Sequence, residues 1–391
     1  MERPPTDLNP RINPWLDLVR SLAILLVLFR HGEQALANAG REPSGFLDVF
    51  FRNGWIGVDL FFVLSGYLIA RHLISAGVDS GRFSLSRYLA TRGLRIIPAY
   101  FAVIALILVG AFPLYVIPSD LLLFRVIYHA FFMQDYLPSN INVVFWSLGV
   151  EEKFYLLAPL LLLGLLRLRS RALQGMLLLA LFLIPVVCRA ESFLRAPAGL
   201  EYVQFFYIFR SPFHMTLEGL MVGVALAVAQ HAGLIRTSRR AGFVIMFLSI
   251  AVLFTWLASH DFMAELGAFD AIVQPSLIAL LAGLLTLGAI QLGKTRMPFA
   301  RPVNMLARLS YSLYLIHFPL IPFVVAVAAP KGVMVFWAFY LISSMLAAFL
   351  LYLLVERPFL LLKDRISDRG MDRSGKDATA RSPKELITNA P

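Results

Sequence analysis

Long apolar segments, separated by short polar connections, decide the fold class of this chain. Each segment is about twenty residues long, the length at which an α-helix crosses the hydrocarbon layer of a bilayer. Strands of a membrane barrel are about half as long and alternate in polarity, unlike these segments. With 59% hydrophobic residues, the chain has too little polar surface for a soluble globule. We therefore expect an all-α, polytopic helical membrane bundle with ten transmembrane helices, at residues 15–36, 54–74, 96–117, 143–166, 174–190, 212–230, 241–260, 272–291, 309–329 and 333–355.

Lys and Arg gather in alternate connections, and this bias predicts the orientation in the membrane. Basic loops stay in the cytoplasm, so we place inside the connections at 82–95, 167–171, 236–240 and 294–301. Ten spans then leave both termini in the cytoplasm. Residues 120–137 are almost apolar enough to cross, but their crossing would export the basic connection that follows the fourth span. We therefore expect a re-entrant or interfacial helix there, on the outer side. The net charge of +11 belongs mainly to the loops and tail and does not indicate nucleic-acid binding.

Two basic side chains interrupt the first apolar segment. Arg20 and His31 are eleven residues apart, which returns to within about 20° of the same helix face, roughly 16 Å further along. A charged side chain in hydrocarbon costs at least about 2.5 kcal/mol, so two aligned ones indicate a polar cavity. We interpret this pair as half of an active site.

Three carboxylates lie inside other predicted spans and need partners there. Asp59 opens the second span, and Ser65 gives the same helix a small face for close packing. The alternative for Asp59 is a structural role in helix packing. Glu151 and Glu152 are neighbours in the fourth span and diverge by about 100°, so we expect one of them to meet His31. An imidazole and a buried carboxyl can share a proton near neutral pH, whereas a structural ion pair is the alternative.

A basic pair precedes the third predicted span. Arg92 and Arg95 are one helical turn apart, and Pro98 suits the first turn of the span that follows. Two guanidinium groups beside the N-terminus of a helix favour an anion such as a phosphate, here facing the cytoplasm. The alternative is that these arginines serve only to orient the chain in the membrane.

The remaining candidates are assigned supporting roles. His317 lies mid-membrane near a proline that frees backbone carbonyls, so we expect it to hydrogen-bond such carbonyls beside the reacting groups. Cys188 is the only cysteine, which excludes an internal disulfide and a multi-cysteine metal site; we expect no bound metal. We divide the chain into a cytoplasmic segment at 1–14, a membrane domain at 15–358 and a largely disordered cytoplasmic tail at 359–391.

Five motifs in order resemble the integral membrane acyltransferase-3 family, over residues 15–358. Gly149 and Lys153 depart from the residues frequent in that family, serine and glutamine. The lysine leaves the charge state of the glutamate pair open. The motifs are the Arg20–His31 spacing, Gly57-Val-Asp-Leu-Phe-Phe-Val-Leu-Ser-Gly66, Arg92-Gly-Leu-Arg95, Trp146-Ser-Leu-Gly-Val-Glu-Glu-Lys-Phe-Tyr155 and Ser312-Leu-Tyr-Leu-Ile-His317.

The resemblance implies an acyl-CoA dependent O-acyltransferase in the inner membrane of a bacterium. The implied reaction moves an acyl group, usually acetyl from cytoplasmic acetyl-CoA, to a hydroxyl of a cell-envelope polysaccharide or related acceptor. Arg20 and His31 become the catalytic pair, with Glu151 or Glu152 orienting the imidazole. Asp59 is a further catalytic candidate. His31 acts as general base or carries the acyl group itself.

By the same resemblance, Arg92 and Arg95 hold the phosphates of coenzyme A, and Ser65, His317 and Trp146 border the substrate pathway. Some members carry a C-terminal hydrolase-like domain, for which this chain has no room, so we expect the membrane domain or a separate partner to meet the acceptor. Five aromatic residues on outer segments can stack on sugar rings or form an interface belt, namely Trp55, Tyr136, Tyr202, Phe206 and Tyr207. The alternative function is a multi-pass transporter of a sugar or small anion.

Overall fold

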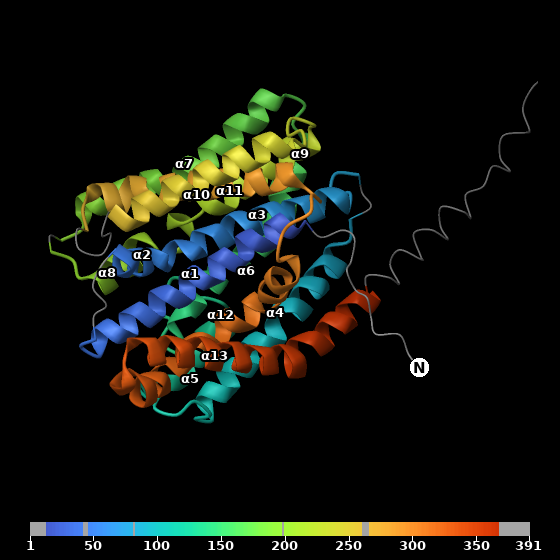
Figure 1. Cartoon of the computed structure of the whole chain (residues 1–391). Helices are drawn as coiled ribbons and strands as arrows, with labels where there is room; N and C mark the ends of the chain where they lie inside the picture. Colours follow the sequence, from blue (N-terminus) through green and yellow to red (C-terminus); the bar gives the residue numbers. More distant parts are fainter. Residues whose placement is uncertain (1–12, 42–45, 81–82, 198, 260–265, 367–391) are drawn as a thin grey trace, which may run out of the picture.

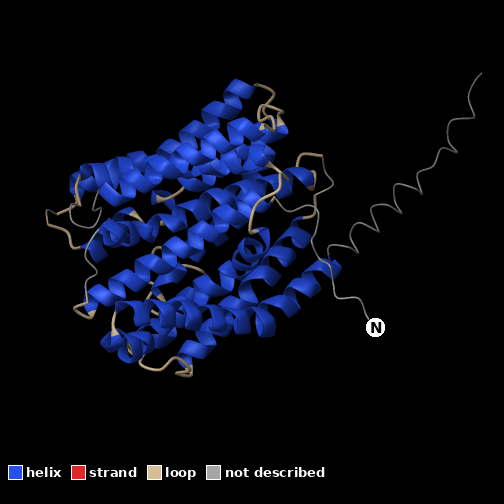
Figure 2. Cartoon of the chain, in the orientation of Figure 1, coloured by secondary structure: helices blue, strands red, loops and turns tan. Residues whose placement is uncertain are grey.

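The protein is a bundle of α-helices. The structure, a computed structural model, describes residues 13–41, 46–80, 83–197, 199–259 and 266–366. Within these ranges the chain consists of helices and loops without a strand, as Figure 2 shows. The expected all-α class is confirmed.

The helices follow the predicted spans closely. Short helices α2 (Phe46–Arg52), α5 (Leu122–Ala130) and α8 (Tyr202–Phe209) lie between the long ones. Nine-residue α5 is too short to cross a bilayer. The longer helices are α1 (Pro14–Asn38), α3 (Gly57–Ser75), α4 (Leu85–Leu108), α6 (Trp146–Arg167), α7 (Arg171–Arg195), α9 (Glu218–His231), α10 (Arg239–Ser259), α11 (Gln274–Leu292), α12 (Ala300–Ala328) and α13 (Val333–Leu351).

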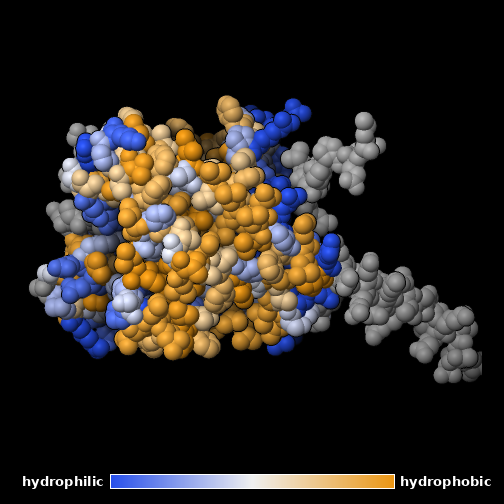
Figure 3. Space-filling model, turned by 90° about the horizontal axis from the view of Figure 1, so that it is seen from below, coloured by the Kyte–Doolittle hydropathy of each residue, from blue (hydrophilic) through white to orange (hydrophobic). Residues whose placement is uncertain are grey.

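Seven helical segments of the described chain are long and apolar enough to cross a membrane. The expected number was ten. Helices α1 and α6 fall short because they carry several charged residues, and α9 has only 14 residues. Figure 3 shows apolar side chains across the middle of one face and polar side chains toward both ends, as a bilayer requires.

Helix α1 runs through the centre of the bundle, where it packs against α3 and α12 (Figure 1). On one side α3 packs along α9, and α10 packs along α11; on the other side α12 packs along α13. The α3–α9 contact is close because Gly66 and Gly223 face it. A side chain at Gly66 would overlap the carbonyl oxygen of Leu220, and one at Gly223 would overlap that of Val63.

One predicted helix boundary is wrong, and the structure describes only part of the expected tail. Helix α4 begins at Leu85, where the Ser84 hydroxyl accepts from the N–H of Arg87, so the basic pair lies two turns inside the helix. Pro98 is in the helix interior, so the N-terminus of α4 does not lie beside Arg92 and Arg95. The tail was expected from residue 359, but the last helix continues to residue 366. The rest of the expected tail, 367–391, and residues 1–12 of the N-terminal segment lie outside the described residues.

Candidate active site

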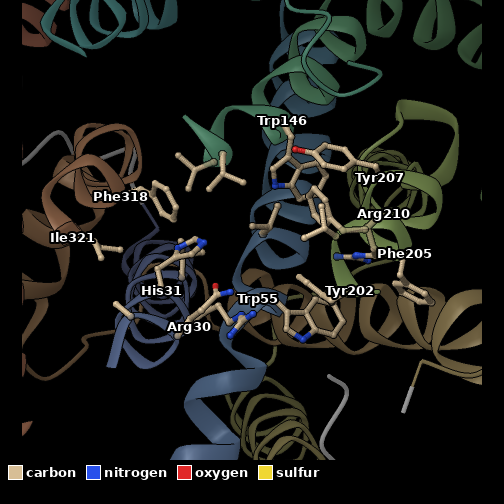
Figure 4. A pocket seen from close by; sticks show the side chains of 18 of the residues that line it. Arg30, His31, Trp55, Trp146, Tyr202, Phe205, Tyr207, Arg210, Phe318 and Ile321 are labelled. Atoms are coloured by element: carbon tan, nitrogen blue, oxygen red, sulfur yellow. The ribbon is translucent and has the colours of Figure 1, made fainter. Parts of the chain in front are cut away.

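Two cavities lie along α1 inside the bundle. The larger, about 320 Å³, is lined by His31 and is called the His31 cavity (Figure 4). The smaller, about 90 Å³, is lined by Arg20 and Arg95 and is called the Arg20 cavity. Val58 and Tyr314 line both cavities. The sequence predicted one polar cavity for Arg20 and His31, whereas the structure has two cavities with a shared wall.

The His31 ring contacts a second histidine from a distant part of the chain. His31 Nδ1 lies 3.0 Å from His317 Nε2, and His317 Nδ1 lies 2.9 Å from the carbonyl oxygen of Leu313. A carbonyl only accepts, so we assign the proton of His317 to Nδ1, which makes its Nε2 an acceptor. His31 then donates from Nδ1, and its Nε2 keeps a lone pair. The two contacts thus select the tautomer in which His31 can take a proton.

A glutamate was expected beside His31, and this expectation is wrong. Glu151 lines the Arg20 cavity, where its carboxylate accepts from Ser65 Oγ at 2.7 Å and from the Tyr155 hydroxyl at 3.2 Å. Glu152 is not among the described residues that line that cavity, and its charge interacts with that of Arg92. The reason is the helix register of α6, which turns Glu151 toward Arg20 and Arg95.

Lys153, the other charged residue of that motif, pairs with neither glutamate. Its Nζ donates to Asp135 Oδ1 and to the carbonyl oxygen of Phe132, both at 2.6 Å. Asp135 lies in the loop before α6, where burial raises the pKa of its carboxyl and Lys153 opposes that shift. Lys153 therefore anchors the loop to α6.

The wall of the His31 cavity is largely aromatic. Four of the five aromatic residues expected on outer segments line it: Trp55, Tyr202, Phe206 and Tyr207. Trp146 lines it as well, with its ring edge-to-face against Phe206 at 5.1 Å. Burial raises the pKa of Tyr207, so this hydroxyl keeps its proton and remains a donor. Tyr136 instead stacks on His214, outside the cavity.

Two arginines also line the His31 cavity, and the sequence analysis did not single them out. Arg30 lies over the ring of Tyr202 at 5.9 Å, and Arg210 lies over the ring of Trp55 at 4.7 Å. Figure 4 places Arg210 across the cavity from His31. A signal was available: Arg210 follows an apolar aromatic run, where a charge needs a partner.

That partner is Asp59, whose carboxylate accepts from Arg210 Nη2 at 2.8 Å. Asp59 is buried, with 4% of its surface exposed. It is not among the described residues that line the two cavities. The structure therefore places Asp59 behind Arg210, as its counterion.

Three arginines were predicted to act near the N-terminal half of α1, and two of them line the Arg20 cavity. Arg20 is 3.9 Å from Asp17 and lines the cavity together with Arg95 and Ser65. Arg92 lies outside it, over the rings of Tyr88 and Tyr155 at 5.8 and 5.9 Å. In the described part of the chain, no cluster of three or more His, Cys, Asp or Glu could hold a metal ion.

Comparison with known proteins identifies the family of this chain. The sequence profile described as "Acyltransferase domain", that of the acyltransferase-3 family, matches residues 13–353. The chain belongs to the acyltransferase-3 family. Among curated relatives of this acyltransferase-3 chain, O-acetyltransferase OatA of Staphylococcus aureus strain NCTC 8325 is 26% identical over 351 residues, covering 81% of this chain and 52% of the relative.

A putative O-acetyltransferase of Staphylococcus aureus strain MSSA476 is 28% identical over 170 residues, which cover 40% of this chain and 26% of the relative. This acyltransferase-3 member thus spans about half the length of OatA. No solved structure matches it significantly. The apolar helices and the bacterial relatives together indicate a bacterial membrane protein.

Proposed function

We propose that this chain is a membrane O-acyltransferase that moves an acetyl group from cytoplasmic acetyl-CoA to a hydroxyl of a cell-envelope glycan or related acceptor. The family membership and the O-acetyltransferase relatives support the reaction type. The observation that carries the proposal is the His31–His317 contact, which leaves an imidazole nitrogen with a lone pair inside a cavity of about 320 Å³. Such pockets are of ligand size, about 300–1,000 Å³.

The acceptor hydroxyl binds in the His31 cavity. His31 Nε2 takes the hydroxyl proton as the hydroxyl oxygen attacks the thioester carbonyl, and the proton then passes to the departing thiolate of coenzyme A. In the covalent variant, Nε2 attacks the thioester carbonyl first and expels the thiolate of coenzyme A. The acceptor hydroxyl then attacks this acyl group, the bond to Nε2 breaks and restores the imidazole, and the hydroxyl proton is taken up by the thiolate. Both routes need the same unprotonated Nε2, which the hydrogen bond to His317 selects.

Acetyl-CoA approaches from the opposite end of α1. Arg20 and Arg95 line a cavity of only about 90 Å³, which suits the thin pantetheine arm and not the nucleotide. The phosphates then lie at the mouth, within reach of Arg92 and Arg95, because guanidinium groups bind phosphate oxygens with paired hydrogen bonds. To reach His31, the thioester passes Tyr314, whose hydroxyl contacts Ser147 Oγ at 2.6 Å and the carbonyl of Val144 at 2.7 Å.

The proposal includes the membrane placement that follows from the basic loops. Ten helices cross the bacterial inner membrane. They include α1 and α6, which carry several charged residues, and α9, which is short, so hydropathy and length alone do not identify these three as spans. Both termini are then cytoplasmic. In this placement the Arg20 cavity faces the cytoplasm and the His31 cavity faces outward, which matches a donor inside and an acceptor outside.

The direct test uses the purified full chain in detergent with acetyl-CoA labelled in its acetyl group. We expect label to leave coenzyme A and to appear in protein, water or an added envelope fraction. Arg95→Ala abolishes this loss at low acetyl-CoA, whereas Arg195→Ala retains it, because the Arg195 side chain is 77% exposed and ion-pairs with Glu191. A transporter would instead carry its substrate across vesicles with the thioester intact. Label that stays on coenzyme A with every acceptor contradicts the proposal.

A further inference from the structure

Arg210 is incompletely satisfied at its buried position. Arg210 has 8% of its surface exposed, and it lines the His31 cavity. Nη2 donates to Asp59, but Nη1 is buried and has no hydrogen-bond partner among the residues that the structure describes. A buried charged N–H without an acceptor is costly, and structures rarely keep one without a use. An acceptor atom supplied by a ligand satisfies Nη1.

The surroundings of Arg210 favour an anionic ligand with a ring. Arg30 adds a second guanidinium group to the same wall, over the ring of Tyr202, and its Nη1 also pairs with the Glu33 carboxylate at 3.4 Å. Asp270 also lines the cavity, and its oxygens accept from the Gly267 N–H at 3.1 Å and from Gln274 Nε2 at 3.3 Å. The counterion of Arg210, Asp59, lies behind it, so the cavity meets the guanidinium and not the carboxylate.

The positions of Arg210 and His31 give such a ligand an orientation. The two side chains face the cavity from opposite sides, with Trp55 and Trp146 between them (Figure 4). A sugar ring stacked on these aromatic surfaces presents a hydroxyl to His31 at one end and its acid group to Arg210 at the other. Oxyanions pair with guanidinium groups by charge-assisted hydrogen bonds, the strongest kind available here.

We propose that the His31 cavity takes an acceptor with an acid group, a carboxylate or a phosphate, and that Arg210 binds this group and sets the acceptor preference. This inference rests on the proposed function for its acceptor site. Arg210 acts through recognition and takes no part in proton transfer.

The test compares sugar probes with and without an acid group. Methyl glucuronide and methyl glucuronamide share one ring and differ by carboxylate against carboxamide, and glucose 1-phosphate tests a phosphate in place of the carboxylate. Binding is followed by intrinsic tryptophan fluorescence, because Trp55 and Trp146 line the cavity. We expect the wild-type protein to bind the glucuronide or the phosphate at least about tenfold more tightly than the amide, the effect of one charge-assisted hydrogen bond.

Three variants separate recognition from folding. In Arg210→Gln we expect the affinities for the glucuronide and the glucuronamide to differ by no more than about twofold. In the exposed control Arg195→Gln, the ratio of these two affinities stays as in wild type. Arg210→Gln leaves Asp59 buried without its counterion, so the double variant Asp59→Asn with Arg210→Gln is used to restore a neutral pair. We expect this double variant also to bind the glucuronide and the glucuronamide with similar affinity. A wild-type ratio near one, or a ratio that survives Arg210→Gln, overturns the inference.

The same probes distinguish this inference from the proposed function. Tight binding of the acid without loss of acetyl from acetyl-CoA contradicts the acyltransferase proposal and leaves the recognition by Arg210 intact. Equal acetylation of the acid and the amide supports the acyltransferase proposal and refutes the role of Arg210.

Discussion

Replacing His317 tests how the chain prepares His31 for proton transfer. In His317→Phe the aromatic volume is nearly kept, but His31 Nδ1 loses the acceptor 3.0 Å away. A hydrogen bond to a group that becomes charged contributes about 1.5–3 kcal/mol, so we expect kcat to fall about 10- to 150-fold. The loss has two causes: the imidazole can shift its proton to Nε2, and the imidazolium formed in the reaction is less stabilised.

The assay measures release of the coenzyme A thiol at varied acetyl-CoA. We expect kcat to fall in His317→Phe while KM for acetyl-CoA stays close to wild type, since His317 is not among the described residues that line the Arg20 cavity. His317→Gln should recover part of the rate, because the amide oxygen can accept from Nδ1.

A matched control is available in His129. This buried histidine also places Nδ1 against the carbonyl oxygen of the residue four positions earlier, at 2.7 Å, but it does not line the described cavities. His129→Phe should therefore leave kcat within about twofold, as for substitutions outside the site. If His317→Phe retains full kcat, or if both variants lose it equally, the reasoning about the tautomer is refuted.

Three further outcomes follow from the cavities and the helix contacts. Arg95→Ala should raise KM for acetyl-CoA about 10- to 100-fold, and Arg95→Lys should recover part of the affinity, as measured by initial rates. Tyr314→Trp should slow transfer at least about tenfold by overfilling the shared wall, whereas Tyr314→Phe should keep most of the rate; equal rates would show that the acyl group does not pass this wall. Gly66→Val should destabilise the α3–α9 contact by about 1–3 kcal/mol or more and lower the thermal unfolding temperature, and an unchanged temperature would contradict the close packing.

The helices were predictable because an apolar segment of about twenty residues is enough to indicate a membrane-spanning helix. Each predicted span overlaps one of the ten longer helices, and the segment at 120–137 forms only nine-residue α5. The start of α4 was misplaced because hydropathy marks the apolar part of a helix and not its polar first turns. Ser84, a good N-cap residue, was the available signal for the true start.

The features of the site that the sequence did not predict depend on contacts between distant segments of the chain. Spacing placed Arg20 and His31 on one face of α1, and both line cavities along that helix. His31 meets His317, however, across 286 residues, and a helical periodicity contains no information on that pairing. For the same reason Glu151 was assigned to the wrong partner, since the rotation of α6 about its axis depends on packing.

Arg210 shows a different limit. It belongs to none of the five motifs and follows α8, so its importance appears only when Asp59 and Trp55 are seen around it. A charged residue at the end of an aromatic run is a weak signal by itself. Its counterion is 151 residues earlier in the sequence, which only the fold reveals.

The central claim is that His31 handles the proton or the acyl group in transfer from acetyl-CoA. The most direct measurement follows label from acetyl-CoA into the acceptor with purified wild type and His31→Ala at equal amounts of folded protein. The account predicts transfer by wild type and none by His31→Ala, with acetyl-CoA binding kept, because Arg20 and Arg95 line a separate cavity. Transfer by His31→Ala at the wild-type rate would contradict it.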